Sequence, residues 1–455
     1  MANSRTISPG TLRERLAKLV KGPVLGAGDP AYEESRHVFN AMIERRPAAI
    51  LKCSCAEDVA HGVTVAREYN LPISIKGGGH SVAGNAVCED GLMLDMSEMK
   101  RISVDPERGI AVAEAGLTLG EFDAATARYG LATTLGVVSM TGIAGLTLGG
   151  GIGWLNGKHG LACDNVLSME VVTADGRLRT VDARQDQDLF WALRGGGGNF
   201  GVVVSFTYSL HPVSKVLAGP ISYPLERAAD ALVLYHQVAS TAPDSLATAA
   251  SMAPGPDGQP CLSLVVCWSG PVDEGEHVLR PLREFGPPIT DAVGPVSYRE
   301  LQSMPDPGYP SGRLHYWKAS FLADLTSEAI DTILRFSATA PSPYTGVGLQ
   351  QITGAASRVA PTATAFAHRA RQYDFLILSQ WDDPADSPDN VRWTRELFDA
   401  MSPHFRGVYV NNLGEEGSDR VRDAYGINYE RLAAIKAAYD PDNVFRLNQN
   451  IRPAA

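Results

Sequence analysis

The sequence lacks any uninterrupted apolar run of the roughly 18 residues that a membrane-spanning helix needs, because Gly, Pro or charged residues break each candidate. Near the N-terminus, Leu12, Leu16 and Leu19 share one helical face among charged residues. This pattern predicts a short amphipathic helix and not a secretion signal. We therefore expect a soluble, cytoplasmic protein without a membrane partner.

Clustered positive charge is also missing. The chain has 40 Lys and Arg against 51 Asp and Glu, a net charge of −11, and no basic run longer than a pair such as Arg45-Arg46. Because binding to a phosphate backbone depends on clustered Lys and Arg, this composition argues against nucleic acid as a partner.

Cysteine is scarce, with six residues in 455, at positions 53, 55, 88, 163, 261 and 267. Six are too few for a disulfide scaffold of this length, and no two have the spacing of a zinc knuckle or a thioredoxin-type site. We expect reduced thiols in a cytoplasmic protein and predict no metal site.

The chain is about three times as long as a typical domain, so two lobes are expected. From about residue 48 to 213, short apolar strands alternate with helices, whereas residues 214–398 are richer in Pro and aromatic side chains. Compact patterning returns from residue 399, with a helix predicted over residues 419–438. We predict an α+β protein with one domain over residues 1–213, to which residues 399–455 return, and a second domain over residues 214–398.

Glycine is the one residue in excess, with 45 copies, and it forms three clusters in the first domain. Gly77–Gly79 precedes His80 and Ser81, and the other clusters lie within residues 142–151 and 195–198. Backbone without Cβ atoms can wrap an anion closely and point several N–H groups at it. One cluster alone is more simply a tight turn, but three in one lobe favour a phosphate-bearing ligand of dinucleotide size.

A Rossmann site is the obvious alternative, since Gly77, Gly79 and Gly84 imitate its fingerprint and Asp95 lies downstream. A Rossmann loop opens a helix, however, and residues 81–90 have little helical periodicity. The sequence also has no GxxxxGK[ST] phosphate loop, so neither nucleotide motif accounts for the clusters.

Four segments together resemble the berberine-bridge-enzyme-like branch of the vanillyl-alcohol-oxidase flavoprotein family, especially its bacterial members of the 6-hydroxy-D-nicotine oxidase type. They are residues 76–95, 136–165, 194–206 and the C-terminal motif YDPDNVFRLNQNI at residues 439–451. The likeness runs from about residue 30 to 452 and is weakest in the middle. It implies a two-lobe PCMH-type FAD-binding fold, in which residues 214–398 form a substrate-binding lobe with an antiparallel sheet.

The resemblance also implies which residues hold FAD. In this family the histidine of the Gly-Gly-Gly-His-Ser motif bonds to the 8α-methyl group of the flavin, so His80 is the expected attachment point. Some relatives have a second bond from a cysteine four residues before the position of Gly142, but this chain has Val138 there, so we predict a single covalent bond. The other expected FAD contacts are Gly77, Gly78, Gly79, Ser81, Gly142, Gly145, Gly149, Gly150, Asp164, Asn165, Val203, Asn448 and Asn450. For the polar members a local capping role is the competing interpretation.

The implied chemistry is hydride transfer from a substrate carbon to the flavin, coupled to loss of a proton from an adjacent O–H or N–H. Residues 407–412 correspond to the substrate side of the flavin. In the plant enzymes a tyrosine follows the asparagine there, whereas this chain has Asn412, so the usual base cannot be carried over. Candidate catalytic side chains are Tyr409, Asn411, His315 and Tyr316, each of which could instead be an ordinary packed residue.

The sequence thus predicts an FAD-dependent oxidase that acts on a small alcohol, amine or secondary metabolite and is reoxidised by O2, as a monomer or homodimer. Four alternatives stay open: a dehydrogenase with another electron acceptor, an oligosaccharide oxidase, a redox-inert flavin-binding protein, and a sugar-nucleotide reductase. A sugar-nucleotide reductase on a similar scaffold would hold FAD non-covalently and would not need His80.

Overall fold

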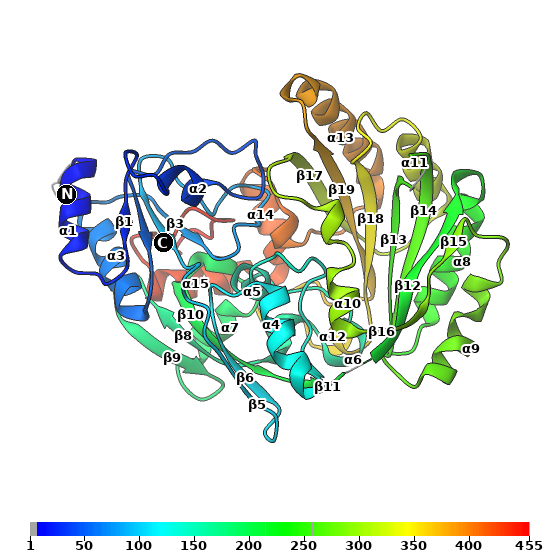
Figure 1. The fold of residues 1–455 in the computed structure, drawn as a ribbon, viewed down its shortest axis with the longest axis horizontal. Helices are drawn as coiled ribbons and strands as arrows, with labels where there is room; N and C mark the ends of the chain where they lie inside the picture. Colours follow the sequence, from blue (N-terminus) through cyan, green and yellow to red (C-terminus); the bar gives the residue numbers. More distant parts are fainter. Residues whose placement is uncertain (1–6, 214, 256–257, 455) are drawn as a thin grey trace.

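The computed structural model describes residues 7–213, 215–255 and 258–454, and it has two lobes that lie side by side (Figure 1). The first lobe contains two main sheets from the N-terminal half of the chain, and the second contains one large antiparallel sheet. Helix α15 (Tyr429–Tyr439), near the C-terminus, lies among the elements of the first lobe. Within the described ranges no helix is both long enough and apolar enough to cross a bilayer.

The smaller sheet of the first lobe has the strand order β1-β2-β4-β3. Its strands are β1 (Val24–Leu25), β2 (Ala49–Lys52), β4 (Leu92–Asp95) and β3 (Ile73–Lys76). Both β2 and β3 run parallel to β4, and α3 (Ala56–Glu68) connects β2 to β3. Every residue of β4 is buried, as expected for a strand between two parallel neighbours. The first glycine cluster therefore begins at the carboxyl end of β3.

The larger sheet of this lobe is antiparallel, in the order β5-β6-β10-β8-β9. Its strands are β5 (Ile102–Asp105), β6 (Ile110–Glu114), β10 (Val202–Ser209), β8 (Val166–Val172) and β9 (Leu178–Asp182). A further short pair joins β7 (Leu131–Ala132) to β11 (His211–Pro212). Strands β6, β8 and β10 agree within about two residues with short apolar strands that the sequence predicts at 110–114, 168–173 and 201–210.

The remaining helices of the first lobe include α1 (Pro9–Ala17), α2 (Tyr32–Arg36), α4 (Leu119–Thr126), α5 (Ile143–Leu148), α6 (Asn156–His159), α7 (Gln187–Leu193) and α14 (Ser418–Tyr425). Two predictions need correction here. Leu12 and Leu16 are buried on α1, but Leu19 lies beyond its end and is 42% exposed. The single helix predicted over residues 419–438 is two helices, because Gly426 interrupts it with φ of 49°.

The second lobe is built on a sheet with the order β15-β12-β14-β13-β18-β19-β17, with β16 also paired to β12. Its strands are β12 (Lys215–Pro224), β13 (Leu246–Pro254), β14 (Pro260–Trp268), β15 (Thr290–Asp291), β16 (Gly294–Ser297), β17 (Leu314–Leu322), β18 (Gly346–Ile352) and β19 (Gln372–Trp381). All of these pairs are antiparallel, so the fold class predicted for this lobe is confirmed.

Four helices, α8 (Ala228–Thr241), α9 (Val272–Arg283), α11 (Ser327–Ser337) and α13 (Ser387–Met401), pack on this sheet around one hydrophobic core. Figure 1 shows α8, α9 and α11 on the side away from the first lobe. The short helices α10 (Tyr298–Ser303) and α12 (Gly354–Arg358) instead contact α4 and α6 of the first lobe. A second large core joins the N-terminal strands to residues from Val408 to Ile451. The exact domain limits at residues 213 and 399 stay predictions.

Candidate active site

A cavity of about 370 Å³ lies where the two lobes meet. Three parts of the chain line it: the glycine loops of the first lobe, the inner face of the second lobe's sheet, and the C-terminal segments 409–413 and 445–449. The volume is within the range typical of small-molecule and cofactor sites. The described residues that line it include no Lys or Arg, and Asp374 is their one carboxyl group.

Two glycine loops cross in direct contact at the wall of this cavity. A Cβ atom on Gly78 would lie 2.4 Å from the backbone N of Gly142, and one on Gly142 would lie 2.3 Å from the backbone N of Gly78. Gly145, one turn further along α5, would by contrast place a Cβ with nothing within 4 Å. The wall is therefore bare backbone, which leaves room for a phosphate group or a flat ring close to the main chain.

His80 follows the first glycine cluster and also lines the cavity. Burial lowers its pKa to about 4, so the imidazole is neutral at pH 7. Its Nε2 atom has no hydrogen-bond partner among the described residues, and its ring stacks on Phe39 with a centroid separation of 3.9 Å. A neutral imidazole of this kind is a competent nucleophile. Val138, where some relatives have a second attachment cysteine, lines the same cavity.

The structure brings many of the predicted FAD contacts together. Those that line the cavity are Gly77, Gly78, Gly79, His80, Ser81, Gly142, Gly145, Val203 and Asn448. Asn448 donates from Nδ2 to the carbonyl oxygens of Gly198 and Phe445, while its Oδ1 has no partner within the described part of the chain.

Gly149, Gly150 and Asn450 are not among the cavity-lining residues. A Cβ on Gly149 would lie 2.0 Å from the side chain of Asn411, and one on Gly150 would lie 2.7 Å from the ring of Phe366. These two glycines therefore allow close packing against the C-terminal segment and the second lobe.

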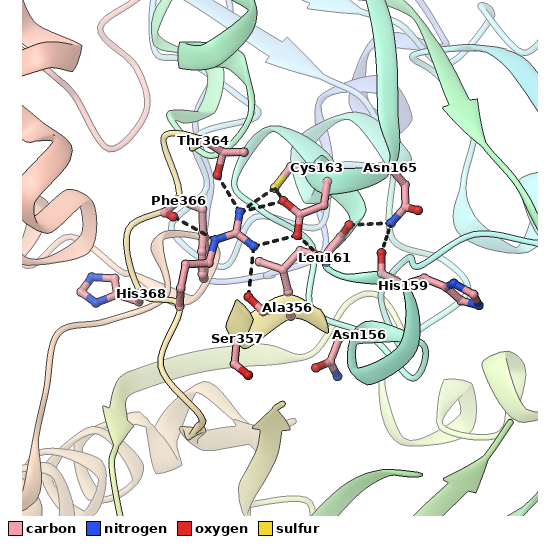
Figure 2. A network of polar contacts seen from close by, with 12 residues as sticks. Asn156, His159, Leu161, Cys163, Asn165, Ala356, Ser357, Thr364, Phe366 and His368 are labelled. Carbon is pink, nitrogen blue, oxygen red and sulfur yellow. Dashed lines mark hydrogen bonds and ion pairs between the residues drawn. The ribbon is translucent and has the colours of Figure 1, made fainter. Parts of the chain in front are cut away.

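Asp164 and Asn165 also lie away from the cavity, and Figure 2 shows Asn165 in a network of polar contacts. Both carboxylate oxygens of Asp164 accept hydrogen bonds from the buried guanidinium of Arg369, at 2.7 and 2.8 Å. Asn165 donates to the carbonyl oxygens of His159 and Leu161. These side chains thus join the first lobe to the segment around Arg369. Cys163, buried beside them, has its pKa raised to about 12 by burial, as expected of an unreactive packed thiol.

The four candidate catalytic residues occupy different environments. Tyr409 and Asn411 line the cavity, and the Tyr409 hydroxyl accepts hydrogen bonds from the Gly151 N–H (2.9 Å) and Asn411 Nδ2 (2.7 Å). Burial raises the pKa of Tyr409 far above its usual range, which favours the protonated phenol. His315 is stacked on the far side of Phe39, and Tyr316 accepts a hydrogen bond from Arg395; neither is among the residues that line the cavity.

One side chain of the site was not predicted from the sequence. Asp374 on β19 is 4% exposed, lines the cavity, and accepts a 2.8 Å hydrogen bond from Asn412 at Oδ2, while Oδ1 has no partner in the described chain. Burial raises its pKa to about 7. Gln350 lies directly opposite it on β18, with an unpartnered Nε2 among the described residues. A lone acidic residue within the apolar run of β19 was the available signal.

A cavity walled by bare glycine backbone, with a neutral histidine on one lobe and a protonatable carboxyl group on the other, is the site of an enzyme that binds a flat, phosphate-bearing redox cofactor. Residues 47–182 match the family described as "FAD binding domain", and residues 408–452 match "Berberine and berberine like".

Known proteins are similar to this one over nearly its whole length. An uncharacterized FAD-linked oxidoreductase of Bacillus subtilis, YgaK, is 35% identical, over 95% of this chain and 97% of that protein. The (R)-6-hydroxynicotine oxidase of Paenarthrobacter nicotinovorans is 29% identical, over 95% and 97% of the two chains. The crystal structure of 6-hydroxy-D-nicotine oxidase from Arthrobacter nicotinovorans superposes with a TM-score of 0.87 at 28% identity, over 96% and 98%. The chain belongs to the berberine-bridge-enzyme-like FAD-linked oxidoreductases, which confirms the predicted family, fold class and enzyme class.

Proposed function

We propose that this protein is an FAD-dependent oxidase in which His80 carries the cofactor covalently and Asp374 accepts a proton from a small organic substrate. The observation that carries the proposal is that one cavity is lined both by the neutral imidazole of His80 and by the buried carboxyl group of Asp374. FAD supplies, when bound, the acceptor for a hydride from the substrate carbon.

The residues present fit this cofactor. Gly77–Gly79, Gly142 and Gly145 offer main chain without side chains, which suits the pyrophosphate and the flat ring system. The unpartnered Oδ1 of Asn448 provides a hydrogen-bond acceptor for a hydroxyl group of the cofactor.

Asp374 is the base that the geometry favours. A general base works best when its pKa is close to the working pH, and burial raises the pKa of the Asp374 carboxyl group to about 7. Asn412 holds Oδ2, which leaves Oδ1 to take the proton from a substrate O–H or N–H. Tyr409, whose pKa is raised, is better suited to holding its neighbours as a protonated phenol.

The lining also favours one class of substrate. Trp317, Tyr309, Leu376 and Leu378 make much of the second lobe's contribution apolar, and no Lys or Arg is among the described lining residues. A phosphorylated or carboxylated substrate would therefore meet no Lys or Arg counter-charge. We propose a neutral or cationic secondary metabolite or N-heterocycle, with O2 as the electron acceptor.

Anaerobic mixing of the purified protein with panels of amines, phenolic alcohols and sugars tests this proposal. We expect an amine or phenolic alcohol to bleach the flavin absorbance near 450 nm and air to restore it with formation of H2O2. Bleaching that air does not reverse would indicate a dehydrogenase, and bleaching by sugars alone would indicate an oligosaccharide oxidase. A flavin that no panel reduces would support the redox-inert alternative.

A further inference from the structure

A short segment of the first lobe, Phe39–Ala41, lies between the His80 loop and strand β17 of the second lobe. The Phe39 N–H donates to the carbonyl oxygen of Gly79 at 2.9 Å, and the Ala41 N–H donates to the carbonyl oxygen of Arg313 at 2.9 Å. The segment is thus fixed at one end to the residue before His80 and at the other end to Arg313, the residue before β17.

Asn40 strengthens this connection. Its Nδ2 donates to the carbonyl oxygens of Val82 (2.8 Å) and His315 (3.0 Å), and its Oδ1 accepts from the His315 N–H at 3.0 Å. Because Asn40 is 3% exposed and makes all these contacts, the position of the neighbouring Phe39 ring is closely defined.

The Phe39 ring is stacked between two imidazoles. Its centroid lies 3.9 Å from that of His80, at an interplanar angle of 16°, and 4.2 Å from that of His315, at 23°. Trp317 closes the edge of this stack, with centroids 5.9 Å from Phe39 and 5.6 Å from His315. Phe39 and His315 are 3% and 1% exposed, so the middle of the stack is closely packed.

Few hydrogen bonds orient these imidazoles, and the one that the His80 ring makes within the described chain is to its own backbone. Nε2 of His80 and both ring nitrogens of His315 lack partners among the described residues. A functional histidine is usually oriented by a hydrogen bond from its second nitrogen to a carbonyl or carboxylate group. A bond to its own backbone leaves Nε2 without a partner, so the face of Phe39 is the stacking contact from another residue that holds the plane of the His80 ring.

We infer that Phe39 is a positioning residue for covalent attachment of the flavin: its ring, backed by His315, holds the imidazole of His80 in the plane from which a ring nitrogen reaches the 8α carbon. This inference rests on the proposed covalent bond. Attachment forms a C–N bond; one hydrogen leaves the methyl group and one proton leaves the imidazole. The two electrons reduce the flavin, and O2 takes up both electrons and both protons as H2O2.

The test measures attachment separately from binding. Full-length protein from riboflavin-limited cells is incubated with FAD in air, quenched in acid at intervals, and the flavin fluorescence of the precipitated chain is recorded. Phe39→Leu keeps an apolar side chain of similar size but removes the flat face. We expect it to bind FAD and become labelled about 100-fold more slowly than wild type, because a misplacement of about 1 Å produces losses of this size.

Two control variants accompany Phe39→Leu. Phe39→Tyr keeps the aromatic face and should label at close to the wild-type rate. Phe190→Leu alters a phenylalanine of the same lobe that is also 3% exposed but lies against the guanidinium of Arg194 and not against His80, and it should also label normally. If Phe39→Leu cannot be folded, His315→Leu removes the other imidazole of the stack and should slow labelling in the same direction.

Normal labelling of Phe39→Leu, or loss of FAD binding altogether, would overturn the inference. If the wild-type chain itself never retained flavin in the precipitate, the proposed covalent bond would be wrong, which is a separate result from a failure of Phe39 to matter.

Discussion

Asn412 donates a 2.8 Å hydrogen bond from Nδ2 to Oδ2 of Asp374, deep in the cavity between the lobes. Asn412 stands where the plant relatives have a tyrosine, so the side chain that departs from the pattern is the one that orients the buried carboxyl group. The usual base at this position is therefore missing, and the proposed base is Asp374 on strand β19, which faces residues 407–412.

Replacement of that carboxyl group should separate proton transfer from cofactor binding. We expect Asp374→Asn to retain its flavin but to be reduced by substrate about 10²- to 10⁴-fold more slowly. In the wild type the rate should rise with pH through about 7, because only the ionised carboxylate accepts a proton, and this rise should be absent in the variant. Anaerobic stopped-flow absorbance measures both.

Asp382→Asn is the matched control, since Asp382 directly follows the same strand but is exposed and paired with Arg313. A variant at Asp374 that kept the wild-type rate and pH profile would remove it from the mechanism.

The crossing of the glycine loops predicts opposite results for two similar substitutions. Gly142→Ala places a Cβ 2.3 Å from the backbone of Gly78, so it should lower the free energy of unfolding by about 1–3 kcal/mol. Gly145→Ala meets no protein atom within 4 Å and should not destabilise the chain, but its methyl group enters the cavity. We expect it to weaken FAD binding about tenfold.

Thermal melts of the apo proteins measure the change in stability. FAD titrations measure the change in affinity, and they use a His80→Ala background so that binding is reversible. Unchanged FAD affinity in Gly145→Ala would show that the cofactor does not lie against this turn of α5.

The ion pair between Asp164 and Arg369 should matter for stability and not for chemistry. Arg369→Met leaves the carboxylate of Asp164 without its partner, which should cost about 3–5 kcal/mol in a denaturant titration. The double variant Asp164→Asn, Arg369→Met should recover much of that loss, because no unpaired charge remains buried. Arg358→Met breaks an exposed pair with Asp244 and should cost less than about 1 kcal/mol. Equal losses in the two single variants would contradict this account.

A second buried carboxyl group predicts how stability depends on pH. Asp123 on α4 is 2% exposed, has a 3.2 Å hydrogen bond from Gln302, and burial raises its pKa to about 7 from an ordinary value of 3.8. The folded chain therefore binds more protons than the unfolded chain between these values, so the free energy of unfolding should fall as pH rises from about 4 to 7.

The pKa of Asp374 is raised as well, so Asp123→Asn should reduce the fall in the free energy of unfolding with pH without abolishing it. Urea titrations of wild type and variant at pH 5 and pH 8 measure the difference. An identical pH dependence in both proteins would show that Asp123 is not the buried acid we describe.

Much of the fold follows from local patterns in the chain. Short apolar segments predicted strands such as β6 and β10, whose apolar residues contribute to the first core. The break at Gly426 was missed because the apolar spacing of residues 419–438 suits one helix, and only the left-handed backbone at that glycine divides it.

The site was predictable where it is made of backbone and less so where it is made of side chains. Gly78 and Gly142 are close in space because two loops cross, and their lack of Cβ atoms makes both visible in the sequence. Asp374 and Trp317 reach the cavity through the pairing of β17, β18 and β19, and such long-range pairing leaves no local pattern. The same pairing turns Tyr316, next to Trp317, towards Arg395.

The attachment of the cofactor to His80 can be tested directly by acid precipitation of wild-type and His80→Ala protein made with ample riboflavin. We predict that the wild-type precipitate keeps the flavin and leaves a colourless supernatant, whereas His80→Ala is yellow when native and releases all its flavin into the supernatant. Complete release from the wild type, or flavin retained by His80→Ala, would contradict the account.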